Sequence, residues 1–339
     1  MSNLFKKAAM FTDIHFGLKN NSVQHLTDCE NFVDWFIATA KEQGCETGFF
    51  LGDWHHHRAS INLQTLNYSL RALEKLNDAF ENFYFLAGNH DLYYRDKRDI
   101  HGAEWAKHLP NVHVINDWFT EGNVTIAPWL VGDDHKRVKQ IKSKYVMGHF
   151  ELPHFKMNQM VEMPDTGEIN AADLDGIDRV FSGHFHMRQN KGNITYIGNA
   201  FPHNFADAGD EQRGATIIEW DGEPEFYNWP EQPTYRVIDL SALIDHADQV
   251  LKPNMHVRVN LDIDISYEEA NFIKETFANG YGLRDISLLP KAKNQEHGEQ
   301  EGVDVGIFQS VDQIITEQLT SVDSDYYNKQ LLLDIYNNL

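Results

Sequence analysis

The chain has 339 residues, a length that suits one large domain and a smaller one. Its 51 Asp and Glu residues outnumber its 29 Lys and Arg residues, so the formal net charge is −22. This charge argues against stable nucleic-acid binding by the chain alone, because phosphate neutralisation dominates such binding. No apolar stretch is long enough to span a bilayer, no signal peptide is recognisable, and the two cysteines, Cys29 and Cys45, build no disulfide framework. We therefore expect a protein of a reducing cytoplasm with no membrane contact.

The first part of the chain alternates between strand and helix patterns. Apolar residues at helical spacing predict one helix from Leu26 to a stop at Gly44 and a second helix over 63–76. Short apolar runs predict buried strands at 49–51, 83–86, 145–147, 180–182, 194–197 and 215–218. This alternation is typical of a layered α/β domain, which we place at residues 1–230.

A second, smaller unit is predicted after Pro230 and Pro233, which mark a boundary. Apolar and polar residues alternate over 255–265, as expected of a half-buried strand. Ser266 and Glu269 form a capping-box pattern that opens a helix, which we expect to end at Gly280. A further strand is predicted at 286–289. The pattern indicates a small α/β domain over residues 234–290.

The C-terminal part of the chain changes in composition. Residues 291–306 are polar and rich in Gln, Glu and Gly, which predicts a linker. Ser310 with Gln313, and later Ser324, are caps that predict two short amphipathic helices within residues 307–339. Two such helices have little core of their own, so we expect them to dock on another protein.

Seven side chains suited to metal ions occur near five predicted strand ends: Asp13, His15, Asp53, Asn89, His149, His184 and His186. Side chains two residues apart on a strand share a face, so Asp13 and His15 are expected to point at a common centre, as are His184 and His186. Glycines precede several of these residues and permit a close approach of backbone to a site. In open α/β sheets, sites form beyond the carboxyl ends of the strands.

The types of ligand indicate the metal and the chemistry. A mixture of carboxylate, imidazole and amide suits Mn, Fe or Zn better than Mg or Ca alone. One carboxylate that bridges two ions about 3.5–4 Å apart would form a two-metal hydrolytic site, which activates water and polarises a phosphoryl group. We expect two Mn²⁺ ions, with Mg²⁺, Zn²⁺ or Fe as alternatives.

The ordered motifs D-x-H, GD, GNHD, GH and GHxH resemble the signature of the calcineurin-like metallophosphoesterases. The resemblance implies a four-layer β-sandwich core flanked by helices, together with a small α/β capping domain and C-terminal helices. It implies one metal held by Asp13, His15, Asp53 and His186, and another held by Asp53, Asn89, His149 and His184. His90 would lie beside the scissile phosphate and protonate the leaving oxygen, and Asp91 would orient His90.

Within that superfamily, several sequence motifs are similar to those of the SbcD-type recombination nucleases. The branch of these nucleases found in T-even phages looks most similar. The motifs are GNHDL at 88–92, GHFEL at 148–152, SGHFH at 182–186 and YIG at 196–198. The resemblance implies a manganese-dependent nuclease in the host cytoplasm, with double-strand exonuclease and single-strand endonuclease activity at DNA ends. It also implies a homodimer, and an SbcC-type coiled-coil ATPase on which the C-terminal helices dock.

Two departures from the family pattern concern single residues. Many members carry a histidine three residues after the aspartate of the second motif, and His56 matches by count as a further catalytic residue. Its neighbours His55 and His57 leave that alignment open, and a solvated histidine run is an equal alternative. Leu92 replaces the small residue of many cellular members, which favours the phage-like branch.

Candidate DNA contacts fall in two segments. Tyr93, Tyr94 and Arg95 directly follow the third motif and are suited to stacking on or clamping a strand, or else to packing on the domain. Lys136 and Arg137 begin a basic run that continues to Lys144. Most charge runs are solvated helix faces, which is the default interpretation, but in this acidic chain the run is also the best candidate for a phosphate contact.

Two other classes of function remain open from the sequence. A stand-alone phosphodiesterase or phosphatase for small molecules would use the same metal ligands, but it would need neither the second domain nor the helical tail. A metal-binding scaffold without catalysis would have no need of His90 beside a complete ligand set.

Overall fold

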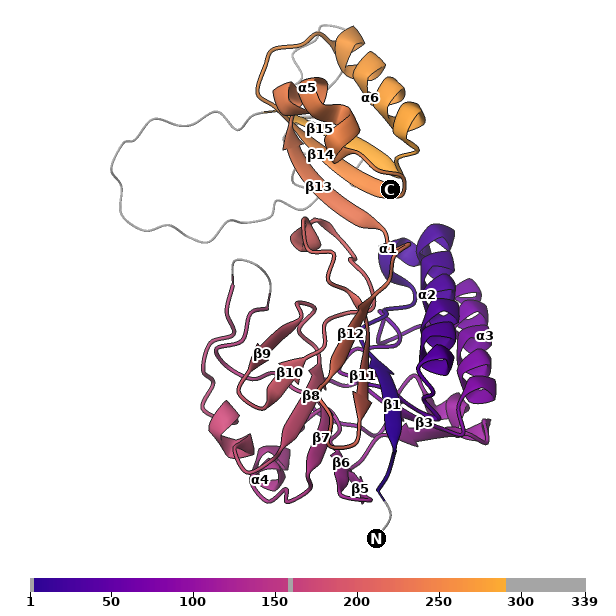
Figure 1. Ribbon diagram of the computed structural model, residues 1–339, viewed down its shortest axis with the longest axis vertical. Coiled ribbons are helices and arrows are strands. Elements are labelled where there is room, and N and C mark those ends of the chain that lie inside the picture. The colour runs from indigo at the N-terminus through magenta and orange to yellow at the C-terminus, as the bar shows by residue number, and fades with distance from the viewer. Residues whose placement is uncertain (1–2, 158–160, 291–339) are drawn as a thin grey trace, which may run out of the picture. The chain divides into compact units, whose positions relative to one another are not determined.

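A computed structural model of the chain describes residues 3–157 and 161–290 (Figure 1). The predicted linker at 291–306 and the predicted helices within 307–339 lie outside the described residues. In the part of the chain that is described, no helix has the length and apolar character needed to cross a membrane.

Two six-stranded sheets form the larger part of the fold. The first has the order β12-β11-β1-β2-β3-β4 and consists of β1 (Lys7–Phe11), β2 (Thr47–Phe50), β3 (Asn82–Leu86), β4 (Val112–Ile115), β11 (Gly214–Glu219) and β12 (Glu225–Asn228). The second has the order β5-β6-β7-β8-β10-β9 and consists of β5 (Phe119–Glu121), β6 (Val124–Ile126), β7 (Tyr145–His149), β8 (Arg179–Gly183), β9 (Gln189–Lys191) and β10 (Ile194–Tyr196). In the first sheet β1, β2, β3 and β4 are parallel, and β11 and β12 add antiparallel pairs on one side only. In the second sheet the strands from β6 to β10 in the sheet order are parallel, and β5 and β9 form antiparallel edges.

The sheets pack face to face, with helices over the outer face of the first sheet and mostly loop segments over the outer face of the second. Met10, Phe49 and Leu86 of the first sheet meet Met147 and Phe181 of the second in one buried cluster. The helices α2 (Val23–Glu42) and α3 (Leu63–Ala79) lie side by side over the other face of the first sheet (Figure 1). Shorter elements complete this part: α1 (Leu18–Asn21), α4 (Asp134–Val138), η1 (Glu104–His108), η2 (Ala171–Leu174) and η3 (Phe205–Asp207). The result is the layered α/β domain that the alternation of strand and helix patterns predicts.

Local sequence signals explain where the main helices begin. The Ser22 hydroxyl accepts the backbone N–H of His25 at the start of α2, and the Asn62 side chain accepts that of Gln64 at the start of α3. The apolar stripe of α2 is buried against the first sheet, as its spacing predicts. Cys29 and Cys45 are both buried and unpaired, and they pack as small apolar residues.

A three-stranded parallel sheet follows in the chain, with the order β13-β14-β15. It consists of β13 (Thr234–Asp239), β14 (Met255–Leu261) and β15 (Asp285–Pro290), connected by α5 (Leu240–Val250) and α6 (Tyr267–Tyr281). Alternate residues of β14 pack under the two helices in a separate apolar cluster. Both helices therefore lie on the same face of this sheet.

Two predicted boundaries in this part are wrong. The capping box of Ser266 and Glu269 forms as predicted, but α6 continues through Gly280 to Tyr281, and Gly282 caps its C-terminus with a left-handed backbone at φ 61°. The strand predicted over 255–265 ends at Leu261, which pairs with Pro290. Because proline has no N–H to donate, the ladder stops there even though the alternating pattern continues.

Polar contacts tie the three-stranded sheet to α1, α2 and the loop that precedes η3. The Arg284 guanidinium forms a two-pronged ion pair with Asp28 of α2, with N···O distances of 2.5 and 2.7 Å. The hydroxyl of Tyr235 donates to the carbonyl oxygen of His203 at 2.8 Å and also contacts the Lys19 ammonium. The side chains of Arg284 and Asp28 are only 10% and 6% exposed, so their pairing compensates charges removed from water.

We expect Arg284→Met to lower the free energy of unfolding by about 3 kcal/mol or more, because Asp28 would remain buried without its partner. The matched control is Lys107→Met, which breaks an exposed pair with Glu104; because water already screens this pair, the change should leave the free energy of unfolding nearly unaltered. Urea denaturation of the two variants provides the comparison. Equal losses in both variants would contradict a structural role for the buried pair.

Candidate metal centre

The predicted ligands lie in loops just beyond the strand ends. β1 ends at Phe11, and Asp13 and His15 follow with positive φ angles of 52° and 51°. Asp53 and His184 also have positive φ, at 63° and 86°. The prediction that strand alternation brings Asp13 and His15, or His184 and His186, onto one face is therefore wrong. Left-handed turns, which are uncommon for residues other than glycine, aim these side chains instead.

Backbone hydrogen bonds hold the loops that follow β1 and β2 side by side. The N–H groups of Asp13 and His15 donate to the carbonyl oxygens of Gly52 and Asp53 at 2.9 and 3.1 Å. Farther along, the N–H of Phe16 donates to the carbonyl of Trp54 at 2.7 Å. Asp13 and Asp53 therefore lie on neighbouring, mutually bonded loops at the carboxyl ends of β1 and β2.

One group of potential ligands consists of Asp13, His15 and His186. The Nε2 atoms of His15 and His186 lie 3.9 and 3.8 Å from Asp13 Oδ1. Asp13 Oδ1 and His15 Nδ1 are buried and have no hydrogen-bond partner among the described residues. The other oxygen, Asp13 Oδ2, accepts the hydroxyl of Thr12 at 2.7 Å and the N–H of His184 at 3.0 Å. One carboxylate oxygen is thus fixed, and the other faces two imidazoles at distances too long for hydrogen bonds.

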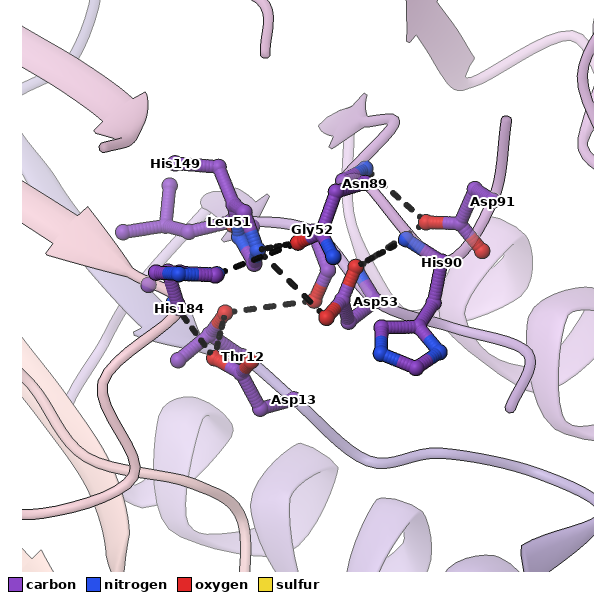
Figure 2. A network of polar contacts seen from close by, with 12 residues as sticks. Thr12, Asp13, Leu51, Gly52, Asp53, Asn89, His90, Asp91, His149 and His184 are labelled. Carbon is purple, nitrogen blue, oxygen red and sulfur yellow. Dashed lines mark hydrogen bonds and ion pairs between the residues drawn. The ribbon is translucent and has the colours of Figure 1, made fainter. Parts of the chain in front are cut away.

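The second group consists of Asp53, Asn89, His149 and His184 (Figure 2). Asn89 Oδ1 lies 3.0 Å from His149 Nε2 and 3.1 Å from His184 Nδ1. The Nδ1–H of His149 donates to the carbonyl of Leu51 at 2.6 Å, which turns Nε2 toward Asp53 Oδ2 at 3.5 Å. The Asn89 amide and the imidazoles of His149 and His184 therefore each direct a polar atom to the same point.

Asp53 lies between the two groups. Its Oδ2 is 3.7 Å from His15 Nε2 and 3.5 Å from His149 Nε2, while its Oδ1 accepts the backbone N–H of His90 at 2.8 Å. The side chain is 3% exposed. This is the position that a carboxylate shared by two metal ions requires.

The electrostatics of the site favour positive charge. Burial opposes ionisation of Asp53, but His149 and His15 outweigh it and hold the Asp53 pKa well below its usual range. Burial likewise disfavours protonated His149, yet Asp53 and Asp13 raise its pKa to about 9. Burial lowers the pKa of His15 well below its usual range, which leaves a neutral imidazole with a lone pair. Metal–ligand distances of about 2.0–2.2 Å place ligand atoms roughly 3–3.5 Å apart, so these donors fit divalent cations.

Two glycines allow the loops to approach this closely. A Cβ on Gly183 would lie 2.2 Å from Thr12 Oγ1 and 2.6 Å from the carbonyl oxygen of Leu51. A Cβ on Gly52, where φ is +106°, would lie 2.4 Å from Nδ1 of His149. A side chain at either position would push apart the loops that carry the potential ligands.

His90 and His56 lie at the edge of the site. The Nδ1–H of His90 donates to the carbonyl oxygen of His56 at 2.8 Å. The two rings stack with centroids 5.4 Å apart, and the ring of His15 lies 4.9 Å from that of His90. Burial and the charge of His90 lower the pKa of His56 to about 4. His56 is therefore a half-buried neighbour of the site, whereas His57 is exposed.

Asp91 has a different role from the predicted one. Its carboxylate accepts backbone N–H groups from Asp53, Trp54, His55 and Gly88 at 2.9–3.1 Å, and the Nδ1–H of His90 is held by His56 instead. The dashed line from Asp91 in Figure 2 runs to such a backbone nitrogen. Asp91 thus fixes the loop that carries Asp53 and does not orient His90. Its burial and the nearby Asp53 charge raise its pKa to about 6.

Some residues of the site carry no motif in the sequence. His203 is buried, its Nε2–H donates to the carbonyl oxygen of Asp13 at 2.9 Å, and its ring packs against His15 and His186. His25 of α2 makes the equivalent contact to the carbonyl of His15 at 3.0 Å. Burial lowers the pKa of both rings. The only signal of His203 in the sequence is its place shortly after the YIG phrase at 196–198.

The predicted DNA-contacting residues have mixed surroundings. Tyr93, Tyr94 and Arg95 are exposed, and the two tyrosine rings pack edge to face. Lys136 pairs with Asp133, and Arg137 lies over Trp118 and lines a cavity of about 670 Å³ that includes no predicted metal ligand. Acidic partners also neutralise Lys139 and Lys144. For the basic run, the default interpretation of a solvated face fits these contacts better.

Comparison with known proteins now decides the family. The profile of the calcineurin-like phosphoesterases matches residues 6–188, which is more than half of the chain and includes every potential ligand described above. The chain belongs to the calcineurin-like phosphoesterases. It is therefore a hydrolase of phosphoester bonds in a family that depends on two metal ions, and the ligand groups around Asp53 are suited to hold them.

Two individual proteins are similar to this calcineurin-like phosphoesterase. Exonuclease subunit 1 of Enterobacteria phage T4 is 24% identical over 321 residues, and the match covers 89% of each chain. The nuclease MPE of Pseudomonas putida is 17% identical, with a TM-score of 0.28; the match covers 56% of this chain and 66%, just under two thirds, of that chain.

We expect Gly183→Ala to weaken metal binding by this phosphoesterase, because the added methyl group would separate the loops of Thr12 and Leu51. The rise in Tm on addition of Mn²⁺ should shrink or vanish. Gly176→Ala is the matched control, since a Cβ there meets nothing within 4 Å and the rise should be kept. An undiminished rise in Tm for Gly183→Ala would show that the close approach is unnecessary.

Proposed function

We propose that this phosphoesterase is the two-metal-dependent nuclease subunit of an SbcCD-type DNA recombination and repair complex. The observation that carries the proposal is the meeting of two ligand groups at Asp53, with His90 at their edge. The proposed activities are double-strand exonuclease and single-strand endonuclease cleavage by hydrolysis of phosphodiester bonds.

The chemistry of the donors supports the assignment of ligands. Asp13, His15, Asp53 and His186 would hold one ion, and Asp53, Asn89, His149 and His184 would hold the other. Imidazole, carboxylate and amide donors together suit Mn²⁺, the metal that we propose. When bound, the pair of ions supplies a water of lowered pKa and neutralises charge on the phosphoryl group.

The protein groups at the edge of the site have distinct proposed roles. His90 would donate a proton from Nε2 to the leaving oxygen, while its Nδ1–H stays on the carbonyl of His56. His56 would position His90 through this bond and through the stacked rings. Asp91 would position Asp53 through the loop backbone, as its four N–H contacts support.

The choice of DNA as substrate rests on sequence likeness and on the rest of the chain. The T4 relative is named as an exonuclease subunit and aligns over 89% of this chain, well beyond the phosphoesterase part. The net charge of −22 and the neutralised basic run leave little of this chain to bind the phosphate backbone. A partner that supplies this binding would resolve the conflict. We propose an SbcC-type ATPase for that role, with the predicted helices of 307–339 as the docking segment and a homodimer of this chain.

His90→Ala should lose cleavage of linear DNA by about 10²–10⁴-fold, because the leaving oxygen would depart without its proton donor. The Mn²⁺-induced rise in Tm should be retained, since His90 is no proposed ligand. His108→Ala, at an exposed histidine outside the site, should keep both properties. Cleavage of linear duplex and single-stranded DNA in the presence of Mn²⁺ is the measurement. Full cleavage by His90→Ala would refute the proposed role of His90.

The partner is tested by co-purification. A chain truncated after residue 306 should lose association with the coiled-coil ATPase while it still hydrolyses a small phosphodiester in the presence of Mn²⁺. The full-length chain is the control for both measurements. Unchanged association would refute the docking role of the C-terminal segment. If the full-length chain with the ATPase cleaves small phosphodiesters but no DNA, the alternative of a stand-alone phosphodiesterase would replace the nuclease proposal.

A further inference from the structure

A cavity of about 220 Å³ opens beside the second ligand group. His149, one of the proposed ligands, forms part of its wall. Trp129, Leu130 and Ile169 supply apolar surface, and Glu151 and Glu168 supply carboxylates. A ligand in this cavity would therefore lie directly next to a phosphate at the metal centre.

Trp129 is the main flat surface at this place. Its ring centroid lies 5.1 Å from that of His184 and 5.9 Å from that of His149. The side chain is only half-buried, although a tryptophan contributes the most favourable free energy when its whole apolar surface is buried. A half-buried indole that borders both a cavity and two potential metal ligands is well placed to pack against a substrate.

The loop of Trp129 is held in place independently of any ligand. An Arg98 N–H donates to the carbonyl oxygen of Trp129 at 2.9 Å, and the same guanidinium pairs with Asp134. The Asp134 carboxylate also accepts the N–H of Val131 at 3.1 Å and the indole N–H of Trp118 at 3.0 Å. Asp134 is 9% exposed and Arg98 is 16% exposed, so this network is largely buried. The indole is thus ordered before a substrate arrives, which lowers the entropy cost of binding.

The chemistry of the walls indicates the ligand. A nucleobase stacks on aromatic side chains through its π-face, whichever base it is. Carboxylates accept hydrogen bonds from exocyclic amino groups, which adenine, cytosine and guanine carry and thymine lacks. The same carboxylates repel phosphate, so the phosphate of a nucleotide would stay at the metal centre while its base enters the cavity.

We propose that this cavity holds the unpaired base of the nucleotide whose phosphodiester is cleaved, with Trp129 as its stacking surface and Glu168 as a reader of amino groups. The proposal rests on the proposed nuclease function and names its substrate more closely: a nucleotide at a DNA end that has left the base stack. Unstacking is least costly for a base that is already single-stranded or mismatched. Frayed or single-stranded ends are therefore the preferred substrates.

The test compares full-length wild-type protein with Trp129→Ala and Trp129→Phe in the presence of Mn²⁺. The substrates are single-stranded oligonucleotides that carry either a normal base or an abasic residue at the cleaved nucleotide. The measured quantity is the ratio of kcat/KM for the two substrates. The wild type should favour the base-bearing nucleotide, Trp129→Ala should reduce that ratio by about 10-fold or more, and Trp129→Phe should keep most of it. Trp129→Phe retains an aromatic ring. Comparison of the two variants therefore distinguishes a loss of stacking from a failure to fold.

Glu168→Gln tests the second element, because an amide can donate a hydrogen bond as well as accept one. The ratio of kcat/KM for adenine or cytosine to kcat/KM for thymine at the cleaved nucleotide should fall toward one in this variant. Quenching of 2-aminopurine placed at that nucleotide provides a binding measurement that does not depend on turnover, and it should be weaker in Trp129→Ala.

Two outcomes would overturn the proposal in different ways. If wild-type protein cleaves base-bearing and abasic nucleotides equally, or if Trp129→Ala slows both to the same extent, the cavity does not hold the base and the nuclease function stands. If wild-type protein hydrolyses bis(p-nitrophenyl) phosphate but cleaves no oligonucleotide, the nuclease function fails and the base site fails with it.

Discussion

Two buried carboxylates and several imidazoles face one another at the centre of this molecule with too few hydrogen bonds among themselves. Burying such groups is costly unless their lone pairs and charges are compensated. Backbone N–H groups donate to one oxygen of each carboxylate. Among the described residues, Asp13 Oδ1 has no hydrogen-bond partner, and the shared Oδ2 of Asp53 lies 3.7 and 3.5 Å from the Nε2 atoms of His15 and His149. Divalent cations at these points would supply the missing compensation. The surrounding fold is arranged so that this otherwise unfavourable cluster persists.

The two sheets and the loops at their ends provide that arrangement. Parallel strands of both sheets end at the same edge, so loops distant in the chain meet there. Asp91 ties three backbone N–H groups of the Asp53 loop to that of Gly88, while His25 and His203 hold the carbonyl oxygens of His15 and Asp13. Tyr235 of β13 contacts the carbonyl of His203 in turn. The small sheet is thereby linked through two hydrogen bonds to the backbone of a proposed ligand, which connects its position with that of the metal centre.

The sequence predicts the layered fold and the gathering of the seven ligand residues, because hydrophobic periodicity and the types and order of polar residues are local properties. It does not predict how the backbone turns. Asp13, His15, Asp53 and His184 adopt positive φ, which no pattern of apolar and polar residues encodes. The role of Asp91 cannot be predicted from the sequence either, since most of its partners are backbone groups of a loop 36–38 residues away in the chain. His203 and Trp129 likewise gain their significance only from neighbours that are remote in sequence.

The negative charge of the chain bears directly on how a polyanion would reach this site. Glu151 and Glu168 border the cavity next to His149, and acidic side chains neutralise several lysines of the basic run. A DNA end would therefore find little attraction outside the metal centre itself. Such a surface disfavours binding along a continuous duplex and leaves the ions as the main attraction for phosphate. With a basic partner to hold the duplex, the proposed nuclease would then act on the nucleotide delivered to the ions rather than on any backbone that touches its surface.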